Sequence, residues 1–190
     1  NPIYVRYSEM IISALLNHKI SGYNKKNIII REANTNDAQE VSRIVYERNG
    51  NPLDEIIDIV LTDIETIRSN KKKAIALVIC INQKIIAFSK CIHSEYFKRS
   101  NYTNLPKGWY LCDLKVMEKY RTNGIGKLLT LYRLNWISRR ANKAFYYSNI
   151  ENKASINLHT SIGFKKVNHS IRVLGSCYSN NIGSLYEFKF

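Results

Sequence analysis

Near the middle of the chain, one segment carries residue types that bind an anion where a helix begins. The segment runs from Leu114 to Lys127 (LKVMEKYRTNGIGK), from a strand-like stretch through Arg121-x-x-Gly124-x-Gly126 into a helical pattern. Glycines let a backbone turn tightly and approach a ligand without interference from a Cβ atom. The amides of a first helical turn and the helix dipole favour a negative group there. With Arg121 and Lys127 adding charge, the pattern predicts a cradle for a diphosphate.

A second segment, from Asn152 to Phe164 (NKASINLHTSIGF), adds polar residues at helical spacing. Asn152 is typical of a helix N-cap and Gly163 of a helix end. Ser155 and His159 are separated by one helical turn, so they share a face of the helix. Taken singly, these residues also fit an ordinary cap, a packed histidine and a terminal glycine, and a glycine pair before a helix is often only a turn. The order and distance of the two segments together are more specific.

In these two segments the chain resembles the GNAT superfamily of acetyl-CoA-dependent N-acetyltransferases. Strand–RxxGxG–helix resembles the coenzyme-binding motif of that superfamily, and N-x-x-[AS]-x-x-x-[YH]-x-x-x-G-F resembles its second motif. The resemblance covers residues 27–190 and is specific from Trp109 to Phe164. Residues 1–26 lie outside it as an N-terminal extension, in which Met10, Ile11, Ala14 and Leu15 have the spacing of an amphipathic helix.

The resemblance implies acetyl-CoA as the co-substrate and no metal. It implies that the backbone of Leu114 and Val116 pairs with the pantetheine arm and that the amides of residues 122–127 hold the pyrophosphate. It also implies that Asn152 hydrogen-bonds the pantetheine or the acyl end. The residues expected at the cofactor are Leu114, Lys115, Val116, Arg121, Thr122, Asn123, Gly124, Ile125, Gly126, Lys127, Asn152 and Ser155.

His159 occupies the position at which many members of the superfamily carry a tyrosine that protonates the departing thiolate. It is therefore the candidate general acid, because an imidazolium can donate a proton near neutral pH. The alternative is a neutral histidine that only packs or accepts a hydrogen bond. The general base stays unassigned: Asp113 lies by strand alternation on the face opposite Leu114 and Val116, and Glu95, Asp113 and Glu151 each fit a solvated surface acid equally well.

The remaining pattern predicts the elements that position these residues. Strands are expected at 27–33, 74–81, 84–92, 109–117, 144–148, 164–173 and 184–190. Helices are expected to begin near Asp37 and at Pro52, and to cover 124–140 and 152–162. The polar, aromatic and basic stretch 95–107 is expected to be a loop. The order βααβββαβαββ predicts an α/β (α+β) domain over 27–190, with a mixed, mostly antiparallel twisted sheet of the GNAT type flanked by helices.

Charge and composition restrict the partners. The 190 residues include 29 Lys and Arg against 15 Asp and Glu, a net charge of +14, and the bases concentrate between Lys84 and Lys143. Such a balance favours a polyanionic partner. The longest apolar run, Ala74–Ile81, is far shorter than the ~20 residues of a membrane span. The four cysteines have no metal-binding spacing, and a reduced, cytoplasmic setting is expected.

We therefore expect a cytoplasmic N-acetyltransferase that moves an acetyl group from acetyl-CoA to a primary amine by direct attack in a ternary complex. The acceptor, a small molecule or a protein or peptide, is not identified by the sequence. Nucleic-acid and membrane partners are not expected, and a homodimer stays open because members of the superfamily commonly dimerise. The alternative is a basic nucleic-acid-binding module, or a module that senses acyl-CoA without turnover. The nucleic-acid alternative explains the charge and the basic aromatic run 96–102, but not the joint spacing of the two motifs.

Overall fold

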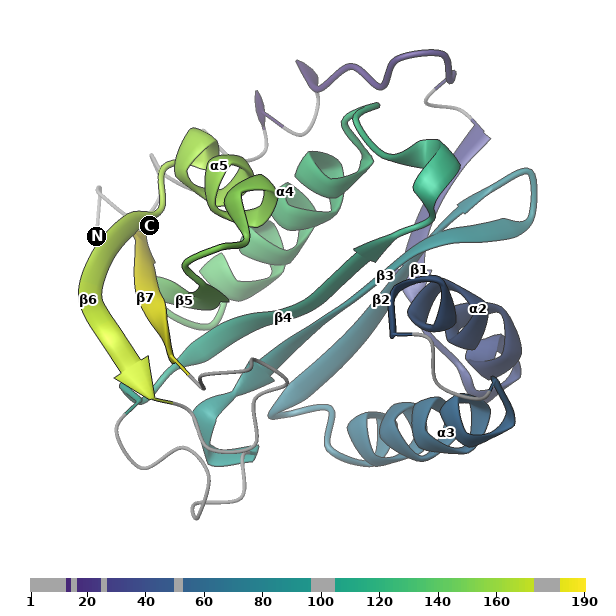
Figure 1. Ribbon diagram of the computed structural model, residues 1–190, viewed down its shortest axis with the longest axis horizontal. Coiled ribbons are helices and arrows are strands. Elements are labelled where there is room, and N and C mark those ends of the chain that lie inside the picture. Colours follow the sequence, from purple (N-terminus) through teal and green to yellow (C-terminus); the bar gives the residue numbers. More distant parts are fainter. Residues whose placement is uncertain (1–12, 15–16, 25–26, 50–52, 97–104, 173–181) are drawn as a thin grey trace. The chain divides into compact units, whose positions relative to one another are not determined.

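The computed structural model describes the chain except residues 1–12, 15–16, 25–26, 50–52, 97–104 and 173–181 (Figure 1). Its strands and α-helices follow the predicted order βααβββαβαββ. They are β1 (Ile28–Glu32), α2 (Ala38–Asn49), α3 (Leu53–Ser69), β2 (Ala74–Ile81), β3 (Lys84–His93), β4 (Trp109–Val116), α4 (Ile125–Ser138), β5 (Lys143–Asn149), α5 (Lys153–Ile162), β6 (Lys165–Arg172) and β7 (Ile182–Lys189).

Some predicted features fall outside the described residues. Met10, Ile11 and Leu15, on which the N-terminal helix was predicted, are among them, as are Cys177 and most of the basic aromatic run 96–102. These predictions are neither confirmed nor contradicted.

The strands hydrogen-bond in the order β1-β2-β3-β4-β5-β7-β6. The pairs β1–β2, β5–β7 and β6–β7 are antiparallel, whereas β4 and β5 are parallel. A parallel pair needs a crossover connection, and α4 supplies it. The predicted mixed, mostly antiparallel sheet with flanking helices is therefore confirmed.

By its internal contacts the chain divides into two compact units. Unit 1 contains residues 1–17, 91–112 and 130–190, and unit 2 contains residues 18–90 and 113–129. The division falls within β3, β4 and α4. It does not coincide with the predicted boundary between an extension, 1–26, and a domain, 27–190, which stays a prediction.

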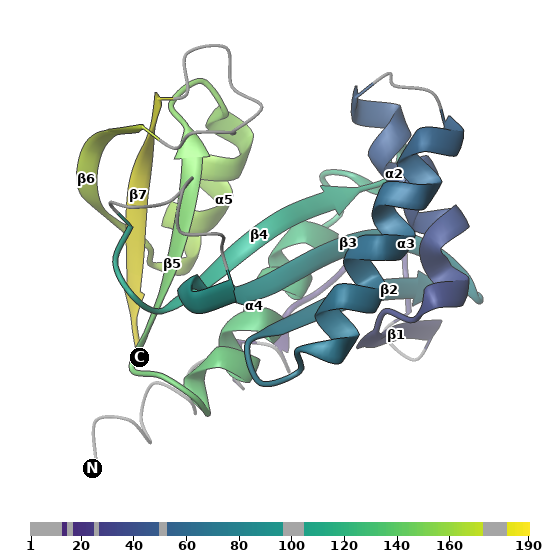
Figure 2. The ribbon, with the colours of Figure 1, turned by 90° about the horizontal axis from the view of Figure 1, so that it is seen from below.

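In unit 2, α2 and α3 lie side by side against the strands β1, β2 and β3 (Figures 1 and 2). Helix α3 is amphipathic: Ile56, Val60, Ile64 and Ile67 recur at helical spacing and are all buried. Every residue of β2 is buried, as expected of a strand covered on both faces.

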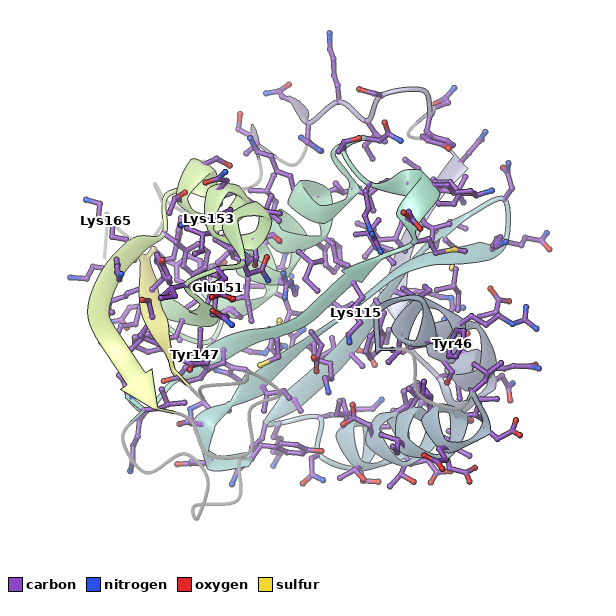
Figure 3. All side chains as sticks on the ribbon, in the orientation of Figure 1. Tyr46, Lys115, Tyr147, Glu151, Lys153 and Lys165 are labelled. Atoms are coloured by element: carbon purple, nitrogen blue, oxygen red, sulfur yellow. The ribbon has the colours of Figure 1, made fainter. Side chains whose placement is uncertain are left out.

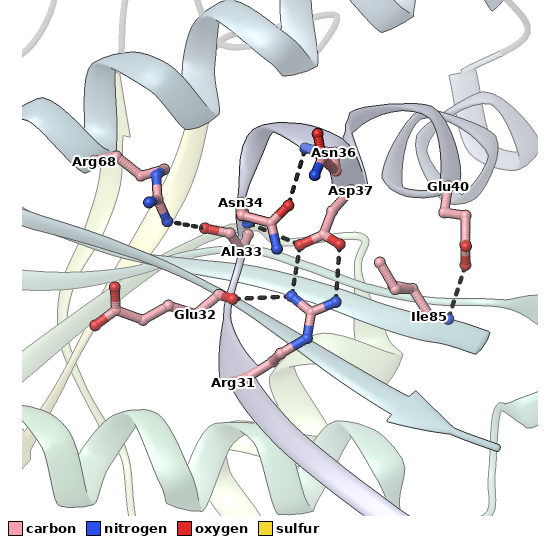
Figure 4. Close-up of polar contacts among 9 residues, drawn as sticks. All are labelled: Arg31, Glu32, Ala33, Asn34, Asn36, Asp37, Glu40, Arg68 and Ile85. Atoms are coloured by element: carbon pink, nitrogen blue, oxygen red, sulfur yellow. Dashed lines mark hydrogen bonds and ion pairs between the residues drawn. The ribbon is translucent and has the colours of Figure 1, made fainter. Parts of the chain in front are cut away.

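The turn from β1 into α2 is held by a network around Asp37, at the end of the 3₁₀-helix η2 (Thr35–Asp37) (Figure 4). Arg31 binds the two carboxylate oxygens of Asp37 at 2.6 and 2.8 Å. The Asn34 amide donates to the same carboxylate at 2.8 Å, while the Asn34 side chain accepts from the Asn36 amide at 2.9 Å. This reciprocal capping box satisfies amides that the helix start would leave unpaired.

In unit 1, α5 follows β5, and its buried face packs against β5 through aromatic contacts. The ring of Tyr146 on β5 stacks on that of His159 on α5, with centroids 3.7 Å apart. Tyr110 and Phe145 stack at 5.2 Å and form a core cluster with Leu185. Tyr110, Phe145 and Tyr146 are thus core residues of this unit, and the stack of Tyr146 on His159 fixes α5 against β5.

Candidate functional site

The segment with the RxxGxG motif folds as strand, turn and helix, as predicted. After β4 comes the 3₁₀-helix η5 (Glu118–Tyr120), and then a turn in which Thr122 and Gly124 have φ angles of 63° and 87°. The Thr122 hydroxyl donates to the Arg121 carbonyl at 2.6 Å. Two left-handed residues separated by one position make the chain turn sharply between β4 and α4. We call residues 121–127 the phosphate loop.

The phosphate loop ends in the first turn of α4. The Gly124 carbonyl accepts the Leu128 amide at 2.9 Å, the first hydrogen bond of the helix. An α-helix offers no carbonyl to the amides of its first turn, and its dipole is positive there. The start of α4 therefore carries the dipole that favours an anion, and the diphosphate contacts predicted for residues 122–127 stay a prediction.

Arg121 is exposed, and its Nε donates to the carbonyl of Val116 at the end of β4, at 3.0 Å. This bond uses the Nε donor of the guanidinium and not its two terminal NH₂ groups. It also means that the Val116 carbonyl already has a donor. Leu114, Lys115 and Val116 are half-buried at the end of β4, and their predicted pairing with pantetheine stays a prediction.

Asp113 departs from the sequence-based expectation. Its φ angle is 49°, so the strand alternation that placed it opposite Leu114 and Val116 does not hold through this residue. Its carboxylate binds the ammonium of Lys90 at 2.7 Å, and the same ammonium binds Asp63 at 2.5 Å. Burial lowers the pKa of Lys90, but the two carboxylates outweigh burial and raise it overall. Asp113 is thus an ion-paired acid, and the general base remains unassigned.

The second motif forms α5, with both predicted caps. The Asn152 Oδ1 accepts the Ser155 amide at 3.2 Å, and Gly163, with φ 120°, ends the helix. Glu151 and Lys153 flank Asn152 and are exposed (Figure 3). Because Oδ1 caps the helix, only the Nδ2 group of Asn152 is left to donate to a ligand.

His159 is buried, with 2% of its surface exposed. Its Nδ1 lies 2.8 Å from the Ser155 carbonyl, which only accepts, so Nδ1 carries a proton. Its Nε2 is buried with no hydrogen-bond partner within the described ranges. Burial and the nearby charge of Arg133 lower the pKa of His159 to about 3, against the weaker opposing effect of the Ser155 carbonyl.

The neutral imidazole of His159 donates through Nδ1 and has only an acceptor at Nε2. The predicted proton transfer needs the imidazolium, which this environment disfavours. The role of general acid stays a prediction, and the geometry favours the other alternative that the sequence left open, a packed neutral histidine.

Two residues that sequence reasoning placed outside the functional region contact the phosphate loop. His18 Nε2 lies 2.9 Å from the Gly124 carbonyl, and the Ser21 amide donates to the Asn123 carbonyl at 3.2 Å. Nothing in the pattern around His18 distinguishes it from a surface histidine, so only the structure could have found it.

The structure thus brings Arg121–Lys127 together in unit 2 and places Asn152, Ser155 and His159 on one helix in unit 1. Within the part of the chain that the structure describes, no group of three or more His, Cys, Asp or Glu side chains is arranged to hold a metal ion. No helix among the same residues is both long and apolar enough to cross a membrane.

Comparison with known proteins gives one family match. The model of the FR47-like protein family matches residues 103–173, which include the phosphate loop and all of α5. No curated protein matches the chain in sequence.

Solved structures of low sequence identity share the fold. A ribosomal-protein-alanine N-acetyltransferase from Brucella melitensis is 18% identical with a TM-score of 0.65, over 85% of this chain and 99% of the other. The yncA protein from Salmonella typhimurium, solved with its cofactor acetyl-CoA, is 18% identical with a TM-score of 0.63, over 86% and 94%. PaiA N-acetyltransferase from Thermoplasma acidophilum, in complex with coenzyme A, is 17% identical with a TM-score of 0.58, over 86% and 99%.

The FR47-like match covers the two motifs on which the resemblance was based, and the shared fold covers most of the chain. The solved structures named above that carry an activity in their names are N-acetyltransferases. The resemblance to the GNAT superfamily is therefore confirmed, and the chain has the fold of a GNAT acetyltransferase.

Proposed function

We propose that the protein is an N-acetyltransferase that transfers the acetyl group of acetyl-CoA to a primary amine. The observation that carries the proposal is the phosphate loop. Two left-handed residues, the first turn of α4 and the guanidinium of Arg121 lie within residues 121–127, and this combination is suited to a diphosphate. Coenzyme complexes of yncA and of PaiA, which share the fold, support acetyl-CoA as the donor.

The chemistry that acetyl-CoA supplies is an activated acyl group on a good leaving group, a thiolate. The task of the chain is to bind and orient it. We assign the diphosphate to the amides of residues 122–127, with Arg121 beside them, because fixed donors need no reorganisation during the reaction. Lys127, in the first helical turn, adds a further positive charge. The predicted contacts of Leu114, Lys115, Val116, Asn152 and Ser155 with the cofactor are retained as proposals.

No side chain is assigned as the general acid or the general base of the reaction. His159 is neutral and buried, and Asp113 is paired with Lys90. We infer that solvent protonates the departing thiolate and that a water deprotonates the amine. The acceptor class is open, and the Brucella melitensis relative, named for ribosomal-protein alanine, makes a peptide N-terminus one class to screen beside small amines.

The same observations favour one alternative, a module that binds acyl-CoA without turnover. His159 is buried and neutral and Asp113 is ion-paired, so neither of these two residues is available for proton transfer in the structure. Free thiol release from acetyl-CoA across an acceptor panel separates the two functions, because a sensor binds CoA without releasing thiol.

The decisive experiment on the loop is Gly126→Asp. Asp places a Cβ atom and a negative charge in the first turn of α4, against the phosphates, and we expect CoA affinity to fall by about 100-fold or more. Calorimetric titration with CoA measures the loss. Asn142→Asp, an exposed position with the same charge change, serves as the control. If Gly126→Asp folds normally and binds CoA as the wild type does, the diphosphate is held elsewhere.

A further inference from the structure

Residues 18–23, which precede β1, are bound to the phosphate loop in unit 2. We call these residues the N-terminal strap. His18 Nε2 lies 2.9 Å from the Gly124 carbonyl, and the Ser21 amide donates to the Asn123 carbonyl at 3.2 Å. The strap thus holds both carbonyls that directly precede α4. Because a carbonyl only accepts, the His18 Nε2 carries a proton.

These two contacts, together with the Leu128 amide that the Gly124 carbonyl also accepts, hold the peptide planes of the loop and so the direction of its amides. No described peptide bond is cis, and in a trans peptide the C=O and N–H groups point in opposite directions. Holding the Asn123 carbonyl toward the strap directs the Gly124 amide away from it. Holding the Gly124 carbonyl directs the Ile125 amide away in the same manner. Both are amides to which the proposed function assigns the diphosphate.

The strap packs so closely against Gly124 that only glycine has room there. A Cβ atom at Gly124 would lie 2.8 Å from His18 Nε2 and 3.2 Å from the Lys19 carbonyl, and its φ angle is 87°. The sequence suggested that glycine here admits a ligand. In the structure, the space that a side chain would fill is taken by the strap.

Apolar contacts anchor the rest of the strap beside the loop. Ile20 is buried, with 6% exposed. The ring of Tyr23 contacts that of Tyr120, with centroids 5.6 Å apart, and Tyr120 is the residue before Arg121. The strap therefore contacts the chain on both sides of the turn, at Tyr120 before it and at Gly124 after it.

We propose that His18 and Ser21 are positioning residues for the diphosphate, so that the segment outside the family resemblance completes the coenzyme site. The proposal rests on the proposed function. His18 contacts the Gly124 carbonyl and fills the space beside the Gly124 Cα atom, and Ser21 donates to the Asn123 carbonyl. Their effect reaches the ligand through the orientation of the Gly124 and Ile125 amides.

The test compares His18→Phe with His18→Gln. Phenylalanine keeps an aromatic ring but cannot donate, whereas the glutamine amide can donate to the Gly124 carbonyl. We expect His18→Phe to weaken CoA binding about fivefold to tenfold, the scale of one neutral hydrogen bond, and His18→Gln to recover most of it. Asn17→Ala is the matched control, because Asn17 is adjacent to His18 and its side-chain amide donates to the exposed Ser13 hydroxyl.

Pantetheine, which lacks the diphosphate, distinguishes positioning from general destabilisation. Its affinity, measured by NMR titration, is expected to be the same in the wild type and in His18→Phe. Equal CoA affinity in the wild type and His18→Phe overturns the proposal while leaving the proposed function intact. So does a parallel loss of CoA and pantetheine binding. A wild-type chain that does not bind CoA overturns the proposed function itself.

Discussion

The side chain of His159 is defined more by its packing than by its place in the motif. Its ring stacks on Tyr146 with an interplanar angle of 6° and meets Phe164 edge-on. Its Nδ1 proton goes to the Ser155 carbonyl of its own helix. These contacts hold a neutral ring in an aromatic layer, so a proton on Nε2 would be costly.

The variant His159→Phe tests this interpretation. Phenylalanine keeps a ring that can stack on Tyr146 and removes both nitrogens. We expect kcat for acetyl transfer to stay within a few-fold of the wild type, whereas loss of a general acid lowers it by about 10²–10⁴-fold. The assay is free thiol release with whichever amine the acceptor screen identifies, and melting temperature is measured on the same variant. A large drop in kcat without a change in melting temperature would restore the catalytic role.

At the scale of elements, the junction of β1 with α2 depends on one buried carboxylate. Only 8% of the Asp37 side chain is exposed. Burial raises the pKa of Asp37, but the hydrogen bonds from Arg31 and from the Asn34 amide outweigh it, and the pKa is lowered overall. The folded chain therefore binds this proton less readily than the unfolded chain does.

The sign of the pH dependence follows from that difference. Above the pKa of an unfolded Asp, about 3.9, the stabilisation by ionised Asp37 is fully present, and it is lost as pH falls through the lowered folded pKa. We expect Asp37→Asn to destabilise the fold by about 1 kcal/mol near pH 7, since Arg31 is partly exposed, and by less in acid. Urea unfolding of the variant and of exposed Asp58→Asn at both pH values measures this. An equal cost at both pH values would contradict it.

The chain as a whole carries a net charge of +14, but several bases of its middle region are occupied. Lys90 is held by two carboxylates, and Arg133 is buried. The Arg140 guanidinium lies 3.5 Å above the Trp136 ring, and Lys143 pairs with Glu187. The number of bases therefore overstates the charge that this region offers to a large polyanion.

We accordingly expect no tight, sequence-tolerant binding of RNA at ~0.1 M salt, because such binding depends on many free cationic contacts. A gel-shift titration with unstructured RNA, repeated at several salt concentrations, is the measurement. Tight binding that weakens steeply with salt would favour the nucleic-acid alternative instead.

The sequence predicted the order of the elements because each carries its own local signal: apolar residues at helical spacing in α3 and a continuous apolar run in β2. It also predicted the turn that leads into α4 and the caps of α5, which are local patterns. The His18–Gly124 contact joins residues far apart in the sequence and leaves no periodic trace. The left-handed conformation of Asp113 gave only a weak signal, because aspartate adopts it more often than most residues but far less often than glycine. The position of Lys90 did carry a signal, because a lysine within a buried strand requires acidic partners.

The ion pairs of Lys90 have a consequence for the chain's own chemistry toward acyl donors. Acylation of an amine requires its neutral form, whose lone pair attacks the carbonyl. Lys90 is only 12% exposed, and its carboxylate partners keep it protonated. Lys90 is therefore inert toward self-acylation while the fold is intact, unlike the exposed lysines. Acylation of Lys90 would therefore require local opening of the strand around it, so the extent of acylation at Lys90 would report local unfolding.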